Sequence, residues 1–252
     1  MLRNASRTSQ ILQSLKGLYL ILDVITLLCP VILSFDNRVR YFKSWGNVFI
    51  VSTIIAIPFL VWDIIFTEEG VWGFNPEYLV GISLFGLPIE EILFFWVVPL
   101  ACVFVYECCK FYFRKFNWRW TNMAIQAGVL GYLIFLSSEN PSGWYTLTTI
   151  IATVITMYFW FNSRKYAQIG VAYILCLIPF LIINGVLTGS WIEEPIVWYN
   201  SNHFSDVRMG TIPMEDAMYG FSLIVSNILL HEKLMQWKGT KSFSTQKVES
   251  MT

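Results

Sequence analysis

The chain has 252 residues and a net charge of zero at pH 7, because 17 basic side chains balance 17 acidic ones. Hydrophobic residues make up 56% of the chain and charged residues 13%, whereas roughly a quarter of a soluble domain is charged. This composition indicates an integral membrane protein and gives no sign of a nucleic-acid partner. The five cysteines show neither a CxxC motif nor a Cys/His ligand spacing, so we expect no metal site.

Seven apolar segments approach the length of a membrane-spanning helix, which needs about 20 residues. In chain order they cover 15–35, 47–66, 79–107, 119–136, 144–161, 167–187 and 207–232. The expected fold is therefore an all-α integral membrane protein with seven transmembrane helices.

The basic residues predict the orientation of these helices. Thirteen of the 17 fall in the loops after the first, third and fifth helices or in the C-terminal tail. They are Arg38, Arg40, Lys43, Lys110, Arg114, Lys115, Arg119, Arg164, Lys165, Lys233, Lys238, Lys241 and Lys247. Since basic loops stay in the cytoplasm, we expect a cytoplasmic C-terminus and an N-terminus on the outside.

The chain contains an internal repeat, most visible in Leu87–Glu107 and Ile212–Glu232. At a constant offset of 125, Pro88, Glu90, Glu91 and Glu107 match Pro213, Glu215, Asp216 and Glu232; the tetrapeptide IPFL at 57–60 recurs at 178–181, an offset of 121. We therefore expect a tail (1–14), a three-helix repeat (15–107), a connector helix (108–139), a second three-helix repeat (140–232) and a cytoplasmic tail (233–252). The copies should be parallel, with a site at their interface.

The repeat also refines the third helix of each copy. The residues before Pro213 are too polar for the membrane interior, and proline suits the first position of a helix. Helices should thus run from Pro213 to Glu232 and, by symmetry, from Pro88 to Glu107. Segment 78–87 should be a separate, irregular piece covered by protein.

Four carboxylates are the candidate catalytic groups: Glu90, Glu91, Glu215 and Asp216. Ionisable side chains in a membrane segment are costly and indicate function. Neighbours on a helix point about 100° apart, so at most one of each pair should face a given cavity. A carboxylic acid kept protonated is what a general acid needs, and aromatic faces attract cations. This combination suits protonation of an alkene and shielding of the carbocation.

Other polar and aromatic residues should lie at the same membrane level as these acids. The candidates for substrate binding are Trp72, Asn75, Phe94, Phe95, Trp198, Asn200 and Tyr219; Asp63 and Arg208 rank second. A structural interpretation stays open for many of them. The acids could cap helices or pair with Arg208, the tryptophans could belong to an interfacial belt, and the asparagines could serve turns.

The paired motifs Pro88-Ile89-Glu90-Glu91 and Pro213-Met214-Glu215-Asp216 resemble those of the heterodimeric, membrane-integral type of lycopene cyclase. The segments Trp72-Gly73-Phe74-Asn75-Pro76 and Val197-Trp198-Tyr199-Asn200 add to the resemblance. It extends from about residue 15 to 232, as though both subunits were fused in one chain.

The resemblance implies a lycopene β-cyclase that closes the ψ-ends of its carotenoid substrate to β-rings without net redox change. It implies that the four carboxylates act as acid and base, without saying which does which. It also implies a bilayer environment and contact with other enzymes of carotenoid biosynthesis. With no GxGxxG element, the chain does not look like flavin-binding cyclases, and we expect no cofactor. A C50 carotenoid cyclase, a carotenoid-binding scaffold and a proton-coupled transporter remain alternatives.

Overall fold

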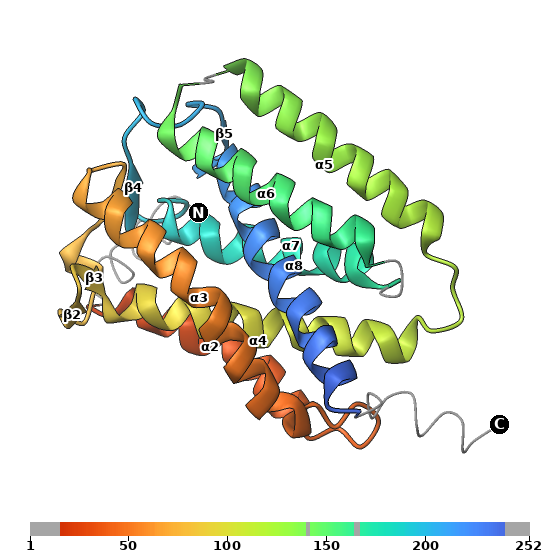
Figure 1. Cartoon of the computed structure of the whole chain (residues 1–252). Helices are drawn as coiled ribbons and strands as arrows, with labels where there is room; N and C mark the ends of the chain where they lie inside the picture. The colour runs from red at the N-terminus through yellow and green to blue at the C-terminus, as the bar shows by residue number, and fades with distance from the viewer. Residues whose placement is uncertain (1–15, 140–141, 164–166, 240–252) are drawn as a thin grey trace, which may run out of the picture.

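The computed structural model describes residues 16–139, 142–163 and 167–239, and within them the chain is mainly helical (Figure 1). Its α-helices are α2 (Leu18–Leu33), α3 (Trp45–Glu68), α4 (Ile89–Tyr112), α5 (Arg119–Glu139), α6 (Trp144–Asn162), α7 (Ile169–Leu187) and α8 (Met214–Trp237). These seven correspond to the seven predicted segments. The predicted tail 1–14, the loop residues Arg164 and Lys165, and the tail beyond Gly239 lie outside the described residues.

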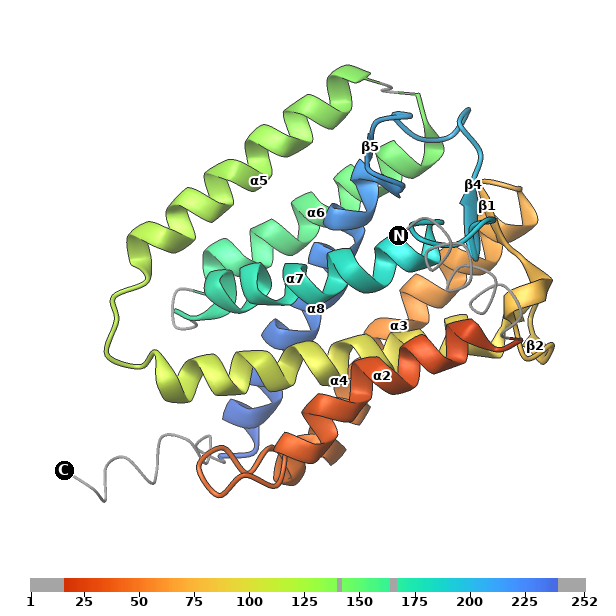
Figure 2. The ribbon, with the colours of Figure 1, turned by 180° about the vertical axis from the view of Figure 1, so that it is seen from behind.

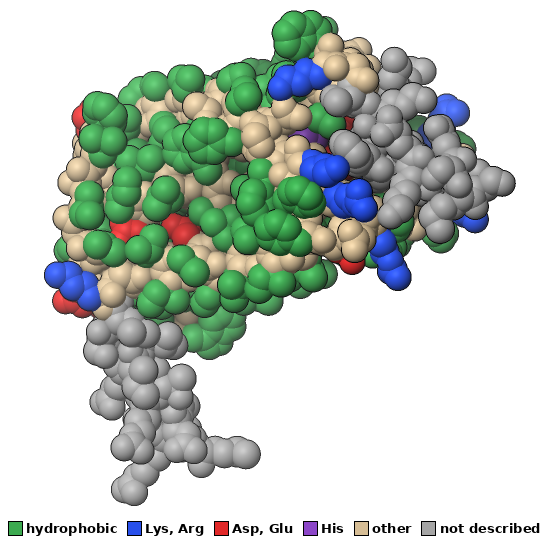
Figure 3. All heavy atoms as spheres, turned by 90° about the horizontal axis from the view of Figure 1, so that it is seen from below, with side chains coloured by type: hydrophobic (Ala, Val, Ile, Leu, Met, Phe, Trp, Pro, Cys, Tyr) green, Lys and Arg blue, Asp and Glu red, His purple; other side chains and the backbone are tan. Residues whose placement is uncertain are grey.

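Length and hydropathy mark four helical segments as able to cross a membrane. They are Tyr41–Glu68, Ile89–Tyr112, Trp144–Asn162 and Ile169–Leu187. Helix α2 is also apolar but shorter, with 16 residues. Hydrophobic side chains cover much of the surface, and most of the visible Lys and Arg side chains lie toward one end of the face in Figure 3. The all-α membrane fold is thus confirmed.

Two copies of a three-helix unit build the bundle. Helix α2 packs along α4 as α6 packs along α8, and the middle helix of each copy also packs against the last helix of the other: α3 against α8, and α7 against α4. Helix α5 connects the copies and lies on the outside, against α6 and α7 (Figure 1). The predicted arrangement of two parallel repeats and a connector is confirmed.

A short antiparallel sheet joins the two copies at one end of the bundle. Strand β1 (Trp72–Phe74) pairs with β4 (Val197–Tyr199), with Trp72 opposite Tyr199 and Gly73 opposite Trp198. Gly73 and Trp198 are equivalent in the repeat, so the pairing is symmetric about them. A pseudo-two-fold axis therefore passes through this pair.

The third helix of each copy begins where the repeat predicts, directly after Pro88 and Pro213. The segment 78–87 was expected to be covered by protein; Tyr78, Leu79 and Leu87 are buried, but for the residues between them the expectation is wrong. Residues 80–86 are exposed and include part of a hairpin of β2 (Ser83–Leu84) with β3 (Leu87–Pro88). Strands β5 (Arg208–Met209) and β6 (Ile212–Pro213) form the equivalent hairpin. A hairpin pairs its own backbone groups, so it can leave the bundle without a protein cover.

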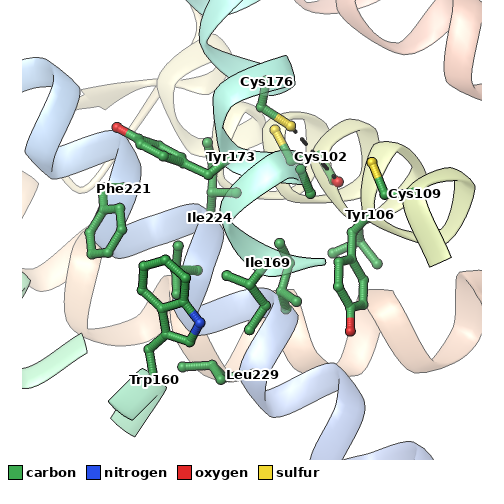
Figure 4. Packing of buried hydrophobic residues seen from close by; sticks show 14 of the residues in the cluster. Cys102, Tyr106, Cys109, Trp160, Ile169, Tyr173, Cys176, Phe221, Ile224 and Leu229 are labelled. Carbon is green, nitrogen blue, oxygen red and sulfur yellow. Dashed lines mark hydrogen bonds between the residues drawn. The ribbon is translucent and has the colours of Figure 1, made fainter. Parts of the chain in front are cut away.

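Both helices also run beyond their predicted ends at Glu107 and Glu232. In the added turn of α4, the ammonium group of Lys110 pairs with Glu107 of its own helix and with Glu232 of α8. The last turns are thereby held in the helical bundle. Buried residues of α3, α4, α5, α6, α7 and α8 form the main core, which includes Cys102, Tyr173 and Phe221 (Figure 4).

Candidate functional site

A small polar cavity lies next to the β1–β4 sheet, between the two repeats. Its volume is about 60 Å³. The polar side chains that line it are Tyr19, Asp63, Glu91, Tyr145, Asn184, Tyr199, Asp216 and Tyr219. They come from α2, α3, α4, α6, α7, β4 and α8, so both copies contribute to one site.

Glu91 and Asp216, which are equivalent in the repeat, face this cavity. The Tyr19 hydroxyl donates a hydrogen bond of 2.6 Å to Glu91 Oε2, and the Tyr145 hydroxyl donates one of 2.7 Å to Asp216 Oδ1. Each tyrosine comes from the first helix of its own repeat. The two carboxylates are therefore held in the same way on either side of the pseudo-two-fold axis.

Asp216 accepts two further hydrogen bonds, which distinguish it from Glu91. Asn184 Nδ2 donates to Asp216 Oδ2 at 2.7 Å, and the Tyr199 hydroxyl donates to the same oxygen at 3.0 Å. Burial, with Asp216 beside it, raises the pKa of Tyr199 well above the ordinary value of a tyrosine. Tyr199 thus stays protonated and serves as a donor.

Asp63 occupies the place in the first copy that Asn184 occupies in the second. Its Oδ1 accepts a hydrogen bond of 2.7 Å from Trp72 Nε1, while its Oδ2 is buried and has no partner among the described residues. The cavity thus contains three carboxyl groups, and Asp63 is the one without a carboxylate equivalent.

Glu90 and Glu215 point away from the cavity and are completely buried. Glu90 Oε1 accepts the backbone N–H of Val80 at 2.6 Å, and Glu215 Oε1 accepts that of Ser205 at 2.7 Å. Glu215 also accepts a hydrogen bond from the Thr146 hydroxyl at 2.6 Å. Each carboxylate ties the loop before a hairpin to the start of the following helix.

Some of the candidate aromatic residues also line the cavity, and others lie away from it. Trp72, Phe94 and Tyr219 line the cavity, whereas Phe95 is buried against Phe59, with ring centroids 6.2 Å apart. Trp198 is 43% exposed and lies over Gly73, outside the cavity. Of the two tryptophans, only Trp72 is therefore a wall of the site.

The two asparagines and Arg208 also lie outside the cavity lining. Asn75 Oδ1 accepts the N–H of Glu77 and so caps a short helical turn. Asn200 Nδ2 donates to the carbonyl of Gly70, which links the loops of the two copies. The guanidinium of Arg208 donates to the carbonyl of Thr211 and forms no ion pair within the described part of the chain.

Residues of the site region that were not among the sequence candidates include Tyr19, Asp23, Tyr145 and Tyr199. Asp23 is buried one helical turn after Tyr19 and interacts electrostatically with Glu91. Tyr19 and Tyr145 occupy equivalent places, so extending the repeat comparison into the first helix of each copy could have found them. Asp23 is visible in the sequence as an acid inside an apolar helix.

The fold and the cavity together define a class: an integral membrane protein made of two parallel repeats, with a buried carboxyl-containing site between them. The family model described as lycopene cyclase matches this chain twice, over residues 16–109 and 142–234. The chain belongs to the lycopene cyclase family. The two matched segments coincide with the two structural repeats and leave α5 between them.

Curated relatives carry the name bifunctional lycopene cyclase/phytoene synthase. The protein from Neurospora crassa is 24% identical over 169 residues, which is 65% of this chain and 25% of the relative. The one from Leptosphaeria maculans is 23% identical over 203 residues, which is 71% of this chain and 33% of the relative. The chain thus spans a quarter to a third of these relatives. No solved structure matches it.

Proposed function

We propose that this chain is a lycopene β-cyclase, which converts the acyclic ψ-ends of lycopene to β-rings. The observation that carries the proposal is the convergence of Glu91, Asp216 and Asp63 on one buried cavity with aromatic walls. Membership of the lycopene cyclase family and the names of the curated relatives support the choice of substrate.

The proposed reaction needs one acid and one base and no redox partner. A carboxylic acid delivers a proton to C2 of the ψ-end, which leaves C1 cationic. The electrons of the C5=C6 double bond then form the C1–C6 bond and move the positive charge to C5. Loss of the C6 proton to a carboxylate restores a C5=C6 double bond. One proton enters and one leaves, so the product is an isomer of the substrate.

The hydrogen bonds suggest which carboxyl group plays which part. Asp216 accepts three of them, and donors of this kind stabilise a carboxylate; we assign it as the base. Glu91 accepts one, from Tyr19, and shares its surroundings with Asp63, a second acid. Two neighbouring carboxyl groups tend to share a proton because both cannot easily be ionised together. We assign Glu91, supported by Asp63, as the acid.

The walls of the cavity fit a cationic intermediate. The faces of Trp72, Phe94 and Tyr219 adjoin the carboxyl groups, and an aromatic face stabilises a cation by roughly 0.5–2 kcal/mol or more where water is excluded. Enclosure by apolar side chains also protects the cation from capture by water.

Expression in a bacterium that accumulates lycopene, followed by chromatography of the pigments, tests the proposal. The wild-type chain should yield monocyclic or bicyclic C40 product. The Glu91→Gln and Asp216→Asn variants should leave lycopene unchanged, whereas Glu77→Gln, an exposed acid near the same end of the bundle, should behave like the wild type.

Unchanged lycopene with a folded wild-type protein in the membrane would contradict the proposal. C50 precursors would then be supplied, because a C50 cyclase should give cyclic product from them. A scaffold would retain pigment without converting it in every variant. A transporter would instead move protons or solute across vesicles in a manner that depends on Glu91.

A further inference from the structure

An apolar cleft beside the polar cavity runs along the bundle, between α2, α4 and α7, which lie together in Figure 2. We call it the lateral cleft; its lining includes Ile25, Cys29, Ala101, Val105, Pro179 and Ile183. Its volume of about 290 Å³ comes close to the lower end of the range for ligand pockets, about 300–1,000 Å³. From Phe94 to Val105 it follows α4 for roughly 16 Å, at 1.5 Å per residue.

The lateral cleft adjoins the carboxyl site. Phe94, Phe180, Asn184 and Leu187 line both spaces. At its outer side the cleft is bordered by residues on the lipid-facing surface, including Ile25, which is 53% exposed. A molecule dissolved in the bilayer could therefore reach the acids without passing through water.

The repeat produces a second cleft at the equivalent place, between α3, α6 and α8. This twin cleft has a volume of about 380 Å³ and includes Ile55, Pro58, Ala152, Ile155, Ser226 and Leu230. Pro58 corresponds to Pro179, and Ser226 to Ala101. Among the described residues, none lines both the twin cleft and the polar cavity.

Aromatic side chains close the twin cleft off from the cavity. Phe59, on the cleft side, contacts Tyr219, on the cavity side, with ring centroids 5.2 Å apart. Trp62 completes the wall, 4.9 Å from Tyr219 and 5.8 Å from Phe59. In the other copy the equivalent of Trp62 is the smaller Ile183, which lines the lateral cleft and has no aromatic ring to complete such a wall.

A second pair of equivalent residues, one large and one small, also makes the two clefts different. Phe95 of the first copy corresponds to Gly220 of the second. A Cβ atom at Gly220 would lie 3.4 Å from the Phe180 ring, so this ring packs directly on the backbone of α8. The equivalent Phe59 instead packs against the bulky Phe95, with ring centroids 6.2 Å apart. The pseudo-symmetric fold thus has one open cleft and one closed cleft.

We propose that the lateral cleft binds the linear polyene of the carotenoid and admits it sideways from the bilayer, while one end group reaches Glu91 and Asp216. This inference rests on the proposed function. It adds that the two equivalent clefts differ, so that only one of them serves the substrate. With one open cleft, only one end of the substrate reacts at a time. A bicyclic product then requires the half-cyclised molecule to withdraw and enter again by its other end.

Two matched substitutions test the proposal, because each cleft offers a half-buried alanine in its lining. Ala101→Trp should fill the lateral cleft and lower the cyclic fraction of the pigment at least tenfold. Ala152→Trp places the same side chain in the twin cleft and should leave the cyclic fraction within twofold of the wild type. The amounts of folded protein in the membrane are compared by fluorescence-detected size exclusion.

Ala101→Val and Ala101→Leu keep the test decisive if the tryptophan variant does not fold. They should lower the cyclic fraction in order of side-chain size. Equal losses in the Ala101 and Ala152 variants, or a loss in Ala152→Trp alone, would overturn the proposal even if the wild type is an active cyclase.

Binding to purified protein separates failure of the cleft from failure of the proposed function. Lycopene is added to each variant in lipid nanodiscs, and the pigment retained per protein is measured by absorbance. If the wild type forms no cyclic product, the proposed function fails. The lateral cleft still stands as the polyene site if Ala101→Trp abolishes retention and Ala152→Trp does not, and it falls if retention is unaffected by Ala101→Trp.

Discussion

Asp63 and Asn184 hold the same place in the two repeats, yet only Asp63 is an acid. Because of this exchange, the two half-sites around the pseudo-two-fold axis differ. One half contains two carboxyl groups, and the other contains one carboxyl group surrounded by hydrogen-bond donors. Asn184 donates to Asp216, whereas Asp63 keeps one buried oxygen without a partner in the described chain. At the scale of single residues, this difference is what separates the acid side from the base side.

The Asp63→Asn variant tests this division. It should keep the hydrogen bond from Trp72, since an amide oxygen also accepts, but it removes the second acid beside Glu91. General acid catalysis contributes about 10²–10⁴-fold to a reaction rate, and Asp63 is one of two acids on this side of the site. We therefore expect cyclase activity to fall at least tenfold while the amount of protein stays the same. Activity equal to that of the wild type, measured as cyclic pigment formed per hour in membranes, would show that Asp63 is only a helix-end partner of Trp72.

Removing a donor from Asp216 should leave less of this residue in the ionised form that acts as the base. Tyr199→Phe deletes one of its three hydrogen bonds, and a bond to a charged group contributes about 1.5–3 kcal/mol. The rate should therefore fall roughly ten- to hundredfold while the amount of bound carotenoid stays the same. Tyr158→Phe, at an exposed position of α6, is the matched control. A rate that does not change in Tyr199→Phe would remove Tyr199 from the machinery.

At the scale of elements, the start of α4 and of α8 combines two tasks in adjacent residues. The first acid of each pair, Glu90 or Glu215, holds the loop that precedes the hairpin, and the second, Glu91 or Asp216, faces the cavity. The helical step of about 100° between neighbours separates the two directions. The hairpin and the site are thus fixed by the same turn of helix.

The Glu90 variants distinguish these tasks. Glu90→Gln retains an oxygen for the N–H of Val80 and should keep cyclase activity within about threefold of the wild type. Glu90→Ala removes the acceptor of the Val80 N–H; the net loss of a hydrogen bond costs about 0.5–1.5 kcal/mol, and thermal unfolding should show a lower Tm. If Glu90→Gln were inactive and Glu91→Gln active, the assignment of the two residues would be reversed.

The sheet between the repeats depends on the absence of a side chain at Gly73. A Cβ atom there would lie 2.3 Å from the Trp198 ring, so Gly73→Ala should destabilise the fold by about 1–3 kcal/mol through overpacking. Gly128→Ala, where a Cβ atom meets nothing within 4 Å, is the control. Adding Trp198→Ala should recover part of the loss, and a double-mutant cycle by thermal unfolding that shows no coupling would argue against this contact.

At the scale of the whole molecule, the sequence predicted the architecture better than the site. Hydropathy located all seven helices, and the repeat corrected the starts of α4 and α8 because proline and polar residues mark them. The spacing of Glu90 and Glu91 showed that only one could face the cavity, but not which one. That choice depends on how α4 is rotated against α2 and α3, and packing decides it.

Other features of the site also arise only between the copies. The repeat matches Gly73 with Trp198, but it does not show that they lie opposite one another on paired strands. For the same reason it treated Trp72 and Trp198 alike, although one lines the cavity and the other covers the sheet. The open and closed clefts follow from pairs such as Ile183 and Trp62, whose effect is visible only once the helices are packed.

The central claim is that a carboxylic acid of the cavity protonates the polyene. Membranes that contain the wild-type chain should be incubated with lycopene in deuterium oxide, and the cyclic product analysed by mass spectrometry. We expect one deuterium for each ring formed, carried at C2, and no ring formation in the Glu91→Gln variant. Rings formed without deuterium, or formed at the wild-type rate by Glu91→Gln, would contradict it.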